Sequence, residues 1–257
     1  MMKRRFIVSL CATLALSYLC FSQDTAQKAR KAPSPPTLNQ ILDHYESALG
    51  GREAWDKVRT RIMRGTIIYT PPGTKGSIES YQEFPDKYFA ITVAPNGGKV
   101  EAGLNGQVGW SKDPVRGLRR LAGSELALSR LEAAFNAEIR IRELFPRMEL
   151  VSAYRVGTRT LYVVRGNSVD GVGATMYFDS QSGLMARMTW ADSSGQLLDE
   201  HIEEYCRVKD VEIRYPCKER VIYPTLTVNF RILEILCNVP INDSLFVPPS
   251  FEYKIQR

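Results

Sequence analysis

The sequence predicts a mainly β fold, in which one long antiparallel sheet is accompanied by a helix at the start and a helix in the middle. Two observations lead to this fold class. Segments of strand length with an apolar face recur between residues 62 and 237, and most are separated only by short turns rich in Gly, Pro, Asn, Asp and Ser. Short turns join antiparallel strands, because a parallel pair needs a long crossover. About a dozen strands result, and a sheet of that size must curl, close on itself or be covered by helices.

The domain is predicted to open with a helix. Thr37 can cap it, and Gln40 completes a capping box. Gly50 and Gly51 end the helix, because glycine takes the left-handed conformation after a C-terminus without steric cost. A short second helix is predicted over residues 52–58. The apolar residues of the first helix recur at helical spacing on one face: Leu38, Ile41, Leu42, Tyr45 and Leu49.

Five strands are predicted in the first half of the sheet. Their ranges are 62–69, 76–84, 87–93, 100–104 and 108–110. Asn105-Gly106 separates the last two strands and is a strong hairpin signal, because both positions of such a turn need positive φ. This half of the chain is therefore expected to be a run of hairpins.

A helical segment is predicted to interrupt the sheet over residues 124–145. Ser124 can cap it, and Pro146 ends it. Its apolar residues are spaced three or four apart: Leu128, Leu131, Phe135 and Ile139. The apolar face most simply docks on the sheet.

Strands resume at Glu149 and lengthen toward the C-terminus. Their ranges are 154–156, 160–165, 175–179, 184–190, 196–207, 211–223 and 227–237. Residues 239–257 are expected to form a loop-like tail, because they contain Pro240, Pro248 and Pro249. Together with the first half, these strands predict one meander in a single domain over residues 37–257.

Residues 1–22 have the pattern of a secretory signal peptide. Three basic residues precede an apolar run at residues 6–21, which is short of the ~20 residues that span a bilayer. A retained anchor and a lipid-modified Cys20 are the alternatives, and the large Leu19 before Cys20 disfavours lipidation. Residues 23–36 predict a flexible, Pro-containing spacer. We therefore expect an exported, periplasmic protein.

Export changes the charge of the protein. The signal holds three basic and no acidic residues, so the mature chain has 31 basic and 28 acidic residues and a net charge of +3 instead of +6. So small a charge does not favour nucleic-acid binding, and neither does the compartment.

Three cysteines remain in the mature chain: Cys206, Cys217 and Cys237. At most one internal disulfide can form. A tight turn at residues 209–210 would place Cys206 opposite Ile213, too far from Cys217 for a bridge. Cys237 could pair with either of the other two, but the favoured interpretation is three buried, small apolar residues.

The sequence contains no recognisable catalytic or metal-binding motif, and we assign no catalytic, cofactor or metal residue. Its two histidines, His44 and His201, are expected at the surface, and no zinc-binding spacing occurs. Glu200, Glu203 and Glu204 raise the question of a carboxylate pair. On a regular strand Glu200 and Glu204 share one face, and an exposed acidic strand explains them better than acid–base chemistry.

Two further groups of residues allow a binding role. Six arginines flank the middle helix and either attract anionic lipid head groups or are a solvated flank: Arg116, Arg119, Arg120, Arg140, Arg142 and Arg147. Aromatic residues recur along the strands and either fill the core or line a concavity for an apolar ligand: Tyr69, Tyr81, Phe84, Tyr88, Phe89, Trp110, Phe178 and Trp190.

The order of several short patterns resembles exported bacterial proteins related to the outer-membrane lipoprotein carriers LolA and LolB. The patterns are Ile41-Leu42, Tyr45, Ala48-Leu49-Gly50-Gly51, Ala54-Trp55, Val58, Gly65-Thr66, Asn105-Gly106, Gly109-Trp110, Tyr177-Phe178-Asp179, Ser182-Gly183-Leu184 and Asn238-Val239-Pro240-Ile241. The resemblance implies an incomplete antiparallel barrel whose open side is covered by helices and whose apolar concavity accepts acyl chains. It assigns no ligand-contacting residue.

These observations favour a periplasmic carrier or binding protein for the acyl chains of lipids or lipoproteins, without catalysis or cofactor and with transient membrane contact. Two alternatives stay open. One is a cell-envelope interaction module with a self-filled core and a protein partner. The other is an enzyme of unfamiliar type, which needs a cleft with strongly shifted pKa values. The volume and lining of the concavity between the sheet and residues 124–145 decide among them.

Overall fold

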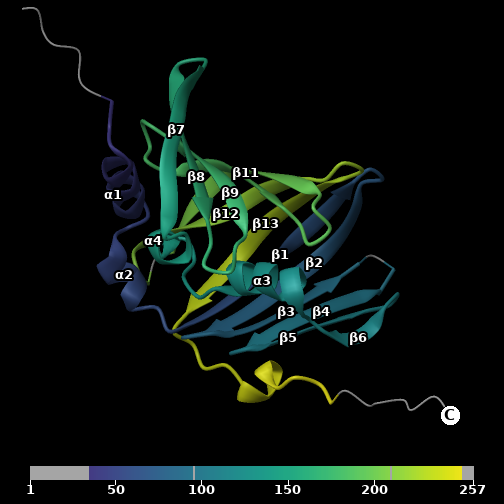
Figure 1. Ribbon diagram of the computed structural model, residues 1–257. Helices are drawn as coiled ribbons and strands as arrows, with labels where there is room; N and C mark the ends of the chain where they lie inside the picture. Colours follow the sequence, from purple (N-terminus) through teal and green to yellow (C-terminus); the bar gives the residue numbers. More distant parts are fainter. Residues whose placement is uncertain (1–34, 95, 209, 251–257) are drawn as a thin grey trace, which may run out of the picture. The chain divides into compact units, whose positions relative to one another are not determined.

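The computed structural model describes residues 35–94, 96–208 and 210–250. Within residues 36–250 it contains one thirteen-stranded antiparallel sheet and a few helices (Figure 1), which confirms the mainly β fold class. The predicted signal peptide, Cys20 and nearly all of the predicted spacer lie outside the described residues. In the described part, no helix has the length and hydropathy needed to cross a membrane.

The elements follow the predicted order closely. The helices are α1 (Leu38–Ala48), α2 (Arg52–Asp56), α3 (Gly123–Ala133), α4 (Ile141–Leu144) and the 3-10 helix η1 (Asp243–Phe246). The first six strands are β1 (Thr60–Thr70), β2 (Thr74–Glu83), β3 (Lys87–Val93), β4 (Lys99–Asn105), β5 (Val108–Asp113) and β6 (Gly117–Arg120). The other seven are β7 (Arg147–Val156), β8 (Arg159–Asn167), β9 (Gly173–Asp179), β10 (Met185–Ala191), β11 (Leu197–Val208), β12 (Ile213–Ile222) and β13 (Thr227–Cys237).

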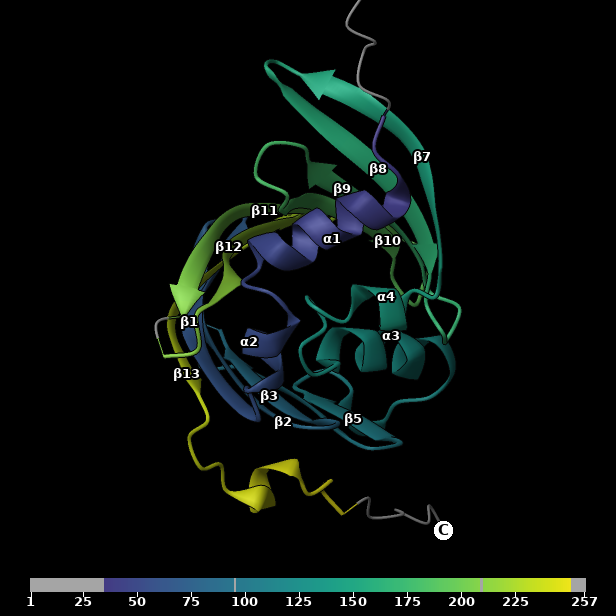
Figure 2. The same cartoon turned by 90° about the vertical axis from the view of Figure 1, so that its left-hand side faces the viewer.

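The sheet is two meanders joined at the middle rather than the single meander that the sequence predicted. The spatial order runs from β6 down to β1, continues with β13 and ends at β7. The first and last strands of the chain are therefore neighbours, and β6 and β7 form opposite edges. The segment between them, with α3 and α4, passes through the concave side, and Figure 2 shows the sheet curved around the helices.

The capping box of α1 is confirmed. The backbone N–H of Gln40 donates to Thr37 Oγ1 (3.3 Å), and the N–H of Thr37 donates to Gln40 Oε1 (2.9 Å). Gly50 ends the helix region with φ 108°, and a Cβ there would lie 2.5 Å from the carbonyl oxygen of Glu212. Only glycine satisfies both constraints. The predicted apolar face, apart from the half-buried Leu38, is buried.

The hairpin at Asn105-Gly106 is confirmed, but its turn lies one residue later than predicted. Asn105 is the last paired residue of β4 and lies opposite Val108. The two turn residues are Gly106 and Gln107, and of these Gly106 has positive φ (55°). Positive φ therefore occurs at one turn position, Gly106, and not at two as predicted.

The middle helix is broken, and Ser124 does not cap it. α3 begins after Ala122 without a side-chain cap and ends at Ala133. The next residue, Ala134, is no longer helical (φ −58°, ψ 125°), and Asn136, two residues later and with φ 55°, donates to the carbonyl oxygen of Trp55 (3.0 Å) and accepts from Arg61 (3.3 Å). These tertiary hydrogen bonds direct the following segment into the core.

Two short elements were missed. Strand β6 pairs with β5 through a turn at Gly117, which has φ 68°. The C-terminal tail contains η1, where Asn242 Oδ1 accepts from the N–H of Ser244 (3.0 Å) and Phe246 is buried. The described tail, to residue 250, is therefore loop-like as predicted except for this one helical turn, which Phe246 anchors.

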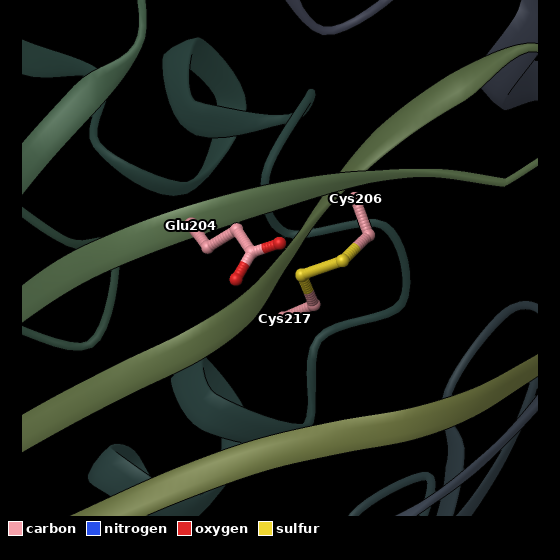
Figure 3. Close-up of side chains that lie close together, drawn as sticks. All are labelled: Glu204, Cys206 and Cys217. Atoms are coloured by element: carbon pink, nitrogen blue, oxygen red, sulfur yellow. A yellow bond between two sulfur atoms is a disulfide. The ribbon is translucent and has the colours of Figure 1, made fainter.

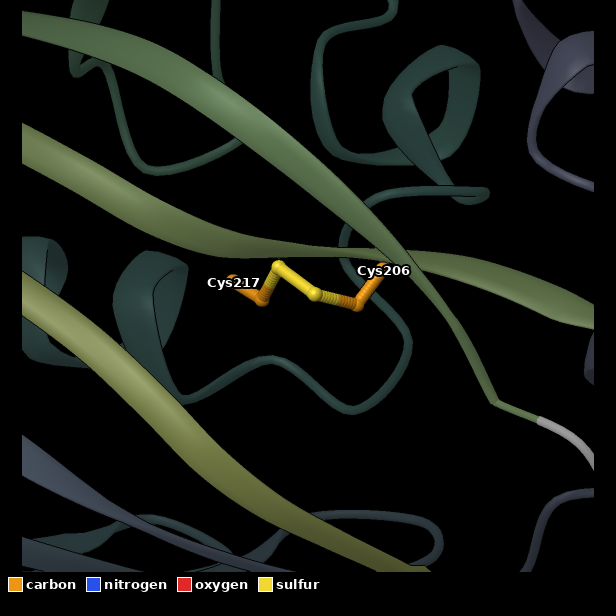
Figure 4. The surroundings of a disulfide bond; sticks show 2 residues. All are labelled: Cys206 and Cys217. Carbon is orange, nitrogen blue, oxygen red and sulfur yellow. A yellow bond between two sulfur atoms is a disulfide. The ribbon is translucent and has the colours of Figure 1, made fainter.

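The expectation that Cys206 and Cys217 cannot pair is wrong. The structure joins them in a disulfide with a Cα–Cα distance of 5.7 Å (Figures 3 and 4). The last ladder pair of β11 and β12 is Val208 and Ile213, and irregularities near Glu204 shift the register.

Cys206 therefore lies opposite Tyr215 rather than Ile213, which brings Cys217 within disulfide range. A pairing with Cys237 is also wrong, because Cys237 is a half-buried free thiol. Of the three cysteines, only Cys237 fits the favoured interpretation of unpaired apolar residues.

Candidate functional site

A cavity of about 480 Å³ lies between the concave face of the sheet and helices α1, α3 and α4. This volume is within the range of small-molecule binding sites. The floor comes from both halves of the sheet, and Leu128 and Leu131 of α3 with Ile141 and Leu144 of α4 face it from the other side. The broken middle segment thus covers the cavity without filling it.

The lining of the cavity is mainly apolar. Four methionines contribute unbranched, adaptable side chains from β1, β9 and β10: Met63, Met176, Met185 and Met188. Other apolar and aromatic lining residues include Ile78, Tyr88, Trp190, Leu198, Ile202, Val221, Phe230 and Ile232. Such a surface suits a flexible hydrophobic ligand better than a rigid polar one.

Four carboxyl groups interrupt this apolar lining. Glu132 comes from α3, Glu138 from the turn after it, Glu200 from β11 and Glu219 from β12. Glu200 is paired with Val221, which places it diagonally across from Glu219 on the same face. Among the described lining residues there is no Lys, Arg or His.

Desolvation inside the cavity raises the pKa of three of these carboxyls, although Glu132 is exposed by surface area and Glu200 and Glu219 are half-buried. Desolvation raises the pKa of Glu132 to about 7. Desolvation, with repulsion from Glu132 and Glu138, raises the pKa of Glu200 to about 7. Desolvation and the charges of Glu200 and Glu138 raise the pKa of Glu219 well above its ordinary value. Each shift has the sign expected for a carboxylate that lacks a compensating cation.

The nearest buried cation, Arg61, is already engaged. Its side chain is 1% exposed, donates to Gln82 (3.0 Å) and Asn136, and lies 4.0 Å from Glu138. Its guanidinium also lies 4.5 Å from the ring centre of Tyr215. Arg61 therefore belongs to a fixed network beside the cavity and is not a lining group.

Two uncharged polar groups at the cavity have no hydrogen-bond partner. The hydroxyl of Tyr45, a residue that is 0% exposed, and Nε1 of Trp190 are both buried and unsatisfied. By contrast, the hydroxyl of Tyr205 donates to the carbonyl oxygen of Met185 (3.0 Å). Buried polar groups are normally paired, so these two mark positions where a ligand group would be stabilised.

The two histidines lie away from the cavity. His44 is exposed on α1, as predicted, and packs beside Gly183. His201 is half-buried, and its Nε2 lies 3.2 Å from Asp199, which also accepts from Arg187 (2.6 Å). The expectation of a freely solvated His201 is therefore corrected to a side chain in an ion-pair cluster.

The expectation that Glu200, Glu203 and Glu204 form an exposed acidic face is wrong for Glu200. Glu200 lines the cavity by regular alternation with Leu198 and Ile202, and Glu203 on the other face binds Lys218 (3.0 Å). The irregular register at Glu204 then changes the alternation, so that Tyr205 lines the cavity and Glu204 is exposed. The alternation Leu198-Glu200-Ile202 was the signal that could have placed Glu200 on an apolar face.

Glu204 lies beside the disulfide of Cys206 and Cys217, and the three side chains resemble a metal-ligand cluster (Figure 3). Their ligand atoms lie within 4.8 Å of one another. Since both sulfur atoms are bonded to each other, neither is a thiolate, the form in which cysteine binds metal. The cluster is therefore a disulfide with a neighbouring surface carboxylate.

The arginines around the middle segment are largely ion-paired. Arg116 and Arg119 bind acidic neighbours on β5 and α3, while Arg140 binds Glu143 (2.7 Å). Arg142 binds Glu46 of α1 (2.7 Å). Arg120 and Arg147 are exposed. These pairs favour the solvated, ion-paired flank over a dedicated lipid head-group site.

The aromatic residues divide between the two faces of the sheet. Tyr88 and Trp190 line the cavity. Tyr81, Phe89 and Trp110 stack on one another, with ring centres 6.1 and 5.9 Å apart, on strand positions that alternate with cavity-lining ones. Phe178 is core and packs against Tyr45 of α1. Both sequence interpretations of these aromatic residues thus apply, each to a different face.

The comparisons with known proteins concern the fold. No family model matches the sequence, and no curated protein matches it. A DUF1329 family protein from Desulfovibrio piger superposes with a TM-score of 0.58 at 13% identity, over 83% of this chain and 98% of the other.

Two further solved structures match over similar lengths. A LolA superfamily protein from Nitrosomonas europaea gives a TM-score of 0.55 at 13% identity, over 83% and 98% of the two chains. A putative outer membrane lipoprotein-sorting protein domain from Vibrio parahaemolyticus gives 0.54 at 10% identity, over 80% and 94%. At such identities the likeness concerns the fold alone: this protein has a LolA-like fold.

Proposed function

We propose that this protein is an exported, non-catalytic carrier or binding protein whose cavity accepts the acyl chain of a lipid or lipoprotein. The observation that carries the proposal is the cavity of about 480 Å³ with its mainly apolar lining. The likeness in fold to a lipoprotein-sorting domain supports the same class of ligand.

The physical need for such a carrier is large. Exposing an acyl chain to water costs ~0.8 kcal/mol per methylene, so a chain of ~15 methylenes costs roughly 12 kcal/mol. A concave apolar sheet with a cover removes most of that cost. Here α3, α4 and the turn between them form the cover, and transient contact with a membrane would deliver the chain.

The cavity weighs against the first alternative, an interaction module whose core is filled by its own side chains. The second alternative, an enzyme, gains one specific observation, because three cavity carboxyls have raised pKa values. The lining nevertheless offers no cationic side chain and is mainly apolar, which suits a hydrophilic or anionic substrate poorly. Acid–base catalysis is therefore the second candidate, and turnover that disappears in Glu200→Gln would support it.

The test compares two neighbouring residues of β13. Ile232 lines the cavity, and Leu233 is 67% exposed. Ile232→Trp fills part of the cavity and should weaken binding of a fluorescent alkyl probe at least about tenfold, because the added ring displaces several methylenes. Leu233→Trp, the matched control, should bind as the wild type does.

Native mass spectrometry of gently purified protein gives the second readout. Wild type and Leu233→Trp should retain a co-purifying lipid that Ile232→Trp lacks. If the wild type carries no lipid and ignores alkyl probes, the proposal fails.

A further inference from the structure

An acyl chain explains the apolar lining but not the four carboxyls within it. We propose, on the basis of the proposed function, that the ligand also carries a cationic amine, and that Glu200 and Glu219, which lie diagonally across adjacent strands, bind this ammonium group. The ligand class is thus a cationic amphiphile, or a lipidated molecule with an amine close to its chain.

The first argument is the sign of the charge. The described lining contains four glutamates and no cationic side chain. Arg61 lies 4.0 Å from Glu138 and is committed to Gln82 and Asn136. A buried carboxylate is costly without a partner, so the cavity without ligand favours protonated carboxyls. An entering cation supplies the missing partner.

The second argument is convergence. The carboxyls come from α3, from the turn after it and from two adjacent strands, which are far apart in the sequence. Glu200 and Glu219 share the floor, and Glu132 belongs to the cover. The charge of Glu132 contributes to the raised pKa of Glu200, so a cation bound at Glu200 would also relieve repulsion between the cover and the floor.

The third argument is independent of the acidic residues. The hydroxyl of Tyr45, a residue of the cavity lining that is 0% exposed, has no hydrogen-bond partner. An ammonium group donates three hydrogen bonds and would satisfy acceptors of this kind.

Other ligand chemistries fit less well. A fatty-acid carboxylate or a phosphate would be repelled by the glutamates. A divalent metal needs several oxygen ligands close together. In the described part of the chain, no three cavity carboxyls bring their oxygens within 4.8 Å of one another. An ammonium group can be held by the two carboxyls of Glu200 and Glu219 alone, which share one face of adjacent strands.

The experiment uses three probes of equal chain length: dodecylamine, dodecanol and dodecanoate. Each is titrated into the full protein by calorimetry at pH 8 and below its aggregation concentration. Dodecylamine should bind at least about tenfold more tightly than dodecanol, and dodecanoate should bind most weakly, because charge-assisted hydrogen bonds to the carboxyls favour the ammonium and repulsion disfavours the carboxylate.

The variants Glu200→Gln and Glu219→Gln should lower the affinity for dodecylamine about tenfold and leave that for dodecanol unchanged. Unchanged dodecanol binding also shows that each variant is folded. The control is Glu204→Gln on the same strand as Glu200, since Glu204 is exposed beside the disulfide. It should change neither affinity.

The outcomes separate the two proposals. If no probe binds, the proposed function fails. If dodecanol or dodecanoate binds as tightly as dodecylamine, or if Glu200→Gln and Glu219→Gln leave the preference intact, the amine proposal is overturned while the acyl-chain function stands. A preference for dodecylamine that only the cavity variants remove supports both.

Discussion

Arginine and glutamate residues have different exposure and different partners on the two faces of the sheet. On strand β1, Arg61 points to the concave side and is 1% exposed, whereas Arg64 is 46% exposed and binds Glu79 and Glu234. On strand β11, Glu200 lines the cavity without a cation, whereas Glu203 binds Lys218 and Arg220. The difference teaches that the face of the sheet, and not the residue type, decides whether a charge is structural, solvated or available to a ligand.

The largest effect should come from Arg61. Arg61→Met removes a buried cation, leaves Glu138 and Gln82 without their partner, and should cost about 3–5 kcal/mol in the free energy of unfolding. Arg64→Met on the convex face should cost less than about 1 kcal/mol, because its ion pairs are half-exposed. Urea unfolding of both variants measures the difference in the free energy of unfolding. Equal losses would show that the two faces do not differ in how strongly they depend on a cation.

The disulfide should come next. It joins β11 and β12, the two strands that carry Glu200 and Glu219. Cys206→Ser with Cys217→Ser should lower the free energy of unfolding by about 2–3 kcal/mol, because the cross-link restricts a short loop in the unfolded chain. Thermal unfolding with and without reductant measures the effect. Cys237→Ser is the control and should respond to reductant as the wild type does.

A pH-dependent effect of moderate size is expected at Glu200. Its pKa of about 7 lies above the ordinary value of ~4.3, so the folded state holds the proton more tightly and the associated stability is full below pH ~4. That stability is lost as the pH rises through 7.

Glu200→Gln should therefore be near neutral at pH 4 and more stable than wild type by about 1–3 kcal/mol at pH 8, by chemical unfolding at both pH values. The other titratable or charged groups near Glu200 are Glu132, Glu138, Glu219, Tyr45, Tyr205, Tyr223 and Arg61. If the free energy of unfolding of Glu200→Gln changes with pH in the same way as that of the wild type, the concave face does not raise the pKa of Glu200 and the comparison of the two faces fails.

The smallest effect is expected at Glu203. Glu203→Gln weakens ion pairs of 3.0 and 3.3 Å with Lys218 and Arg220, whose side chains are more than a third exposed. Its cost should stay below about 1 kcal/mol and shrink further in 0.5–1 M salt, because exposed pairs are screened. A large, salt-independent loss would show that the convex face also holds its charges tightly.

Local signals predicted most of the fold. The capping box at Thr37 and Gln40 and the turn at Gly106 depend on neighbours in sequence, and both form. The predictions failed where distant groups compete with local preference. Just after the middle helix ends at Ala133, Asn136 forms hydrogen bonds with Trp55 and Arg61, neither of which is near it in the chain, and these bonds fix the path of the following segment.

The candidate site was less accessible to sequence reasoning. The apolar residues of the strands predicted a concave apolar face, but Glu200 was assigned to the surface because it stands among other acidic residues. Glu132 and Glu219 attracted no attention, since a single glutamate on a helix or strand is ordinarily solvated. Their role follows from enclosure by a cover and a floor that only the folded chain brings together.

The sequence by itself determined the class of the protein: a long antiparallel sheet with an early capped helix, short turns and an apolar strand face, because each of these follows from neighbouring residues. Only the tertiary structure decided that β1 pairs with β13, that Cys206 reaches Cys217 and that four carboxyls meet in one cavity. These features depend on register, on irregular strand positions and on desolvation by distant segments, which are properties of packing and not of sequence spacing.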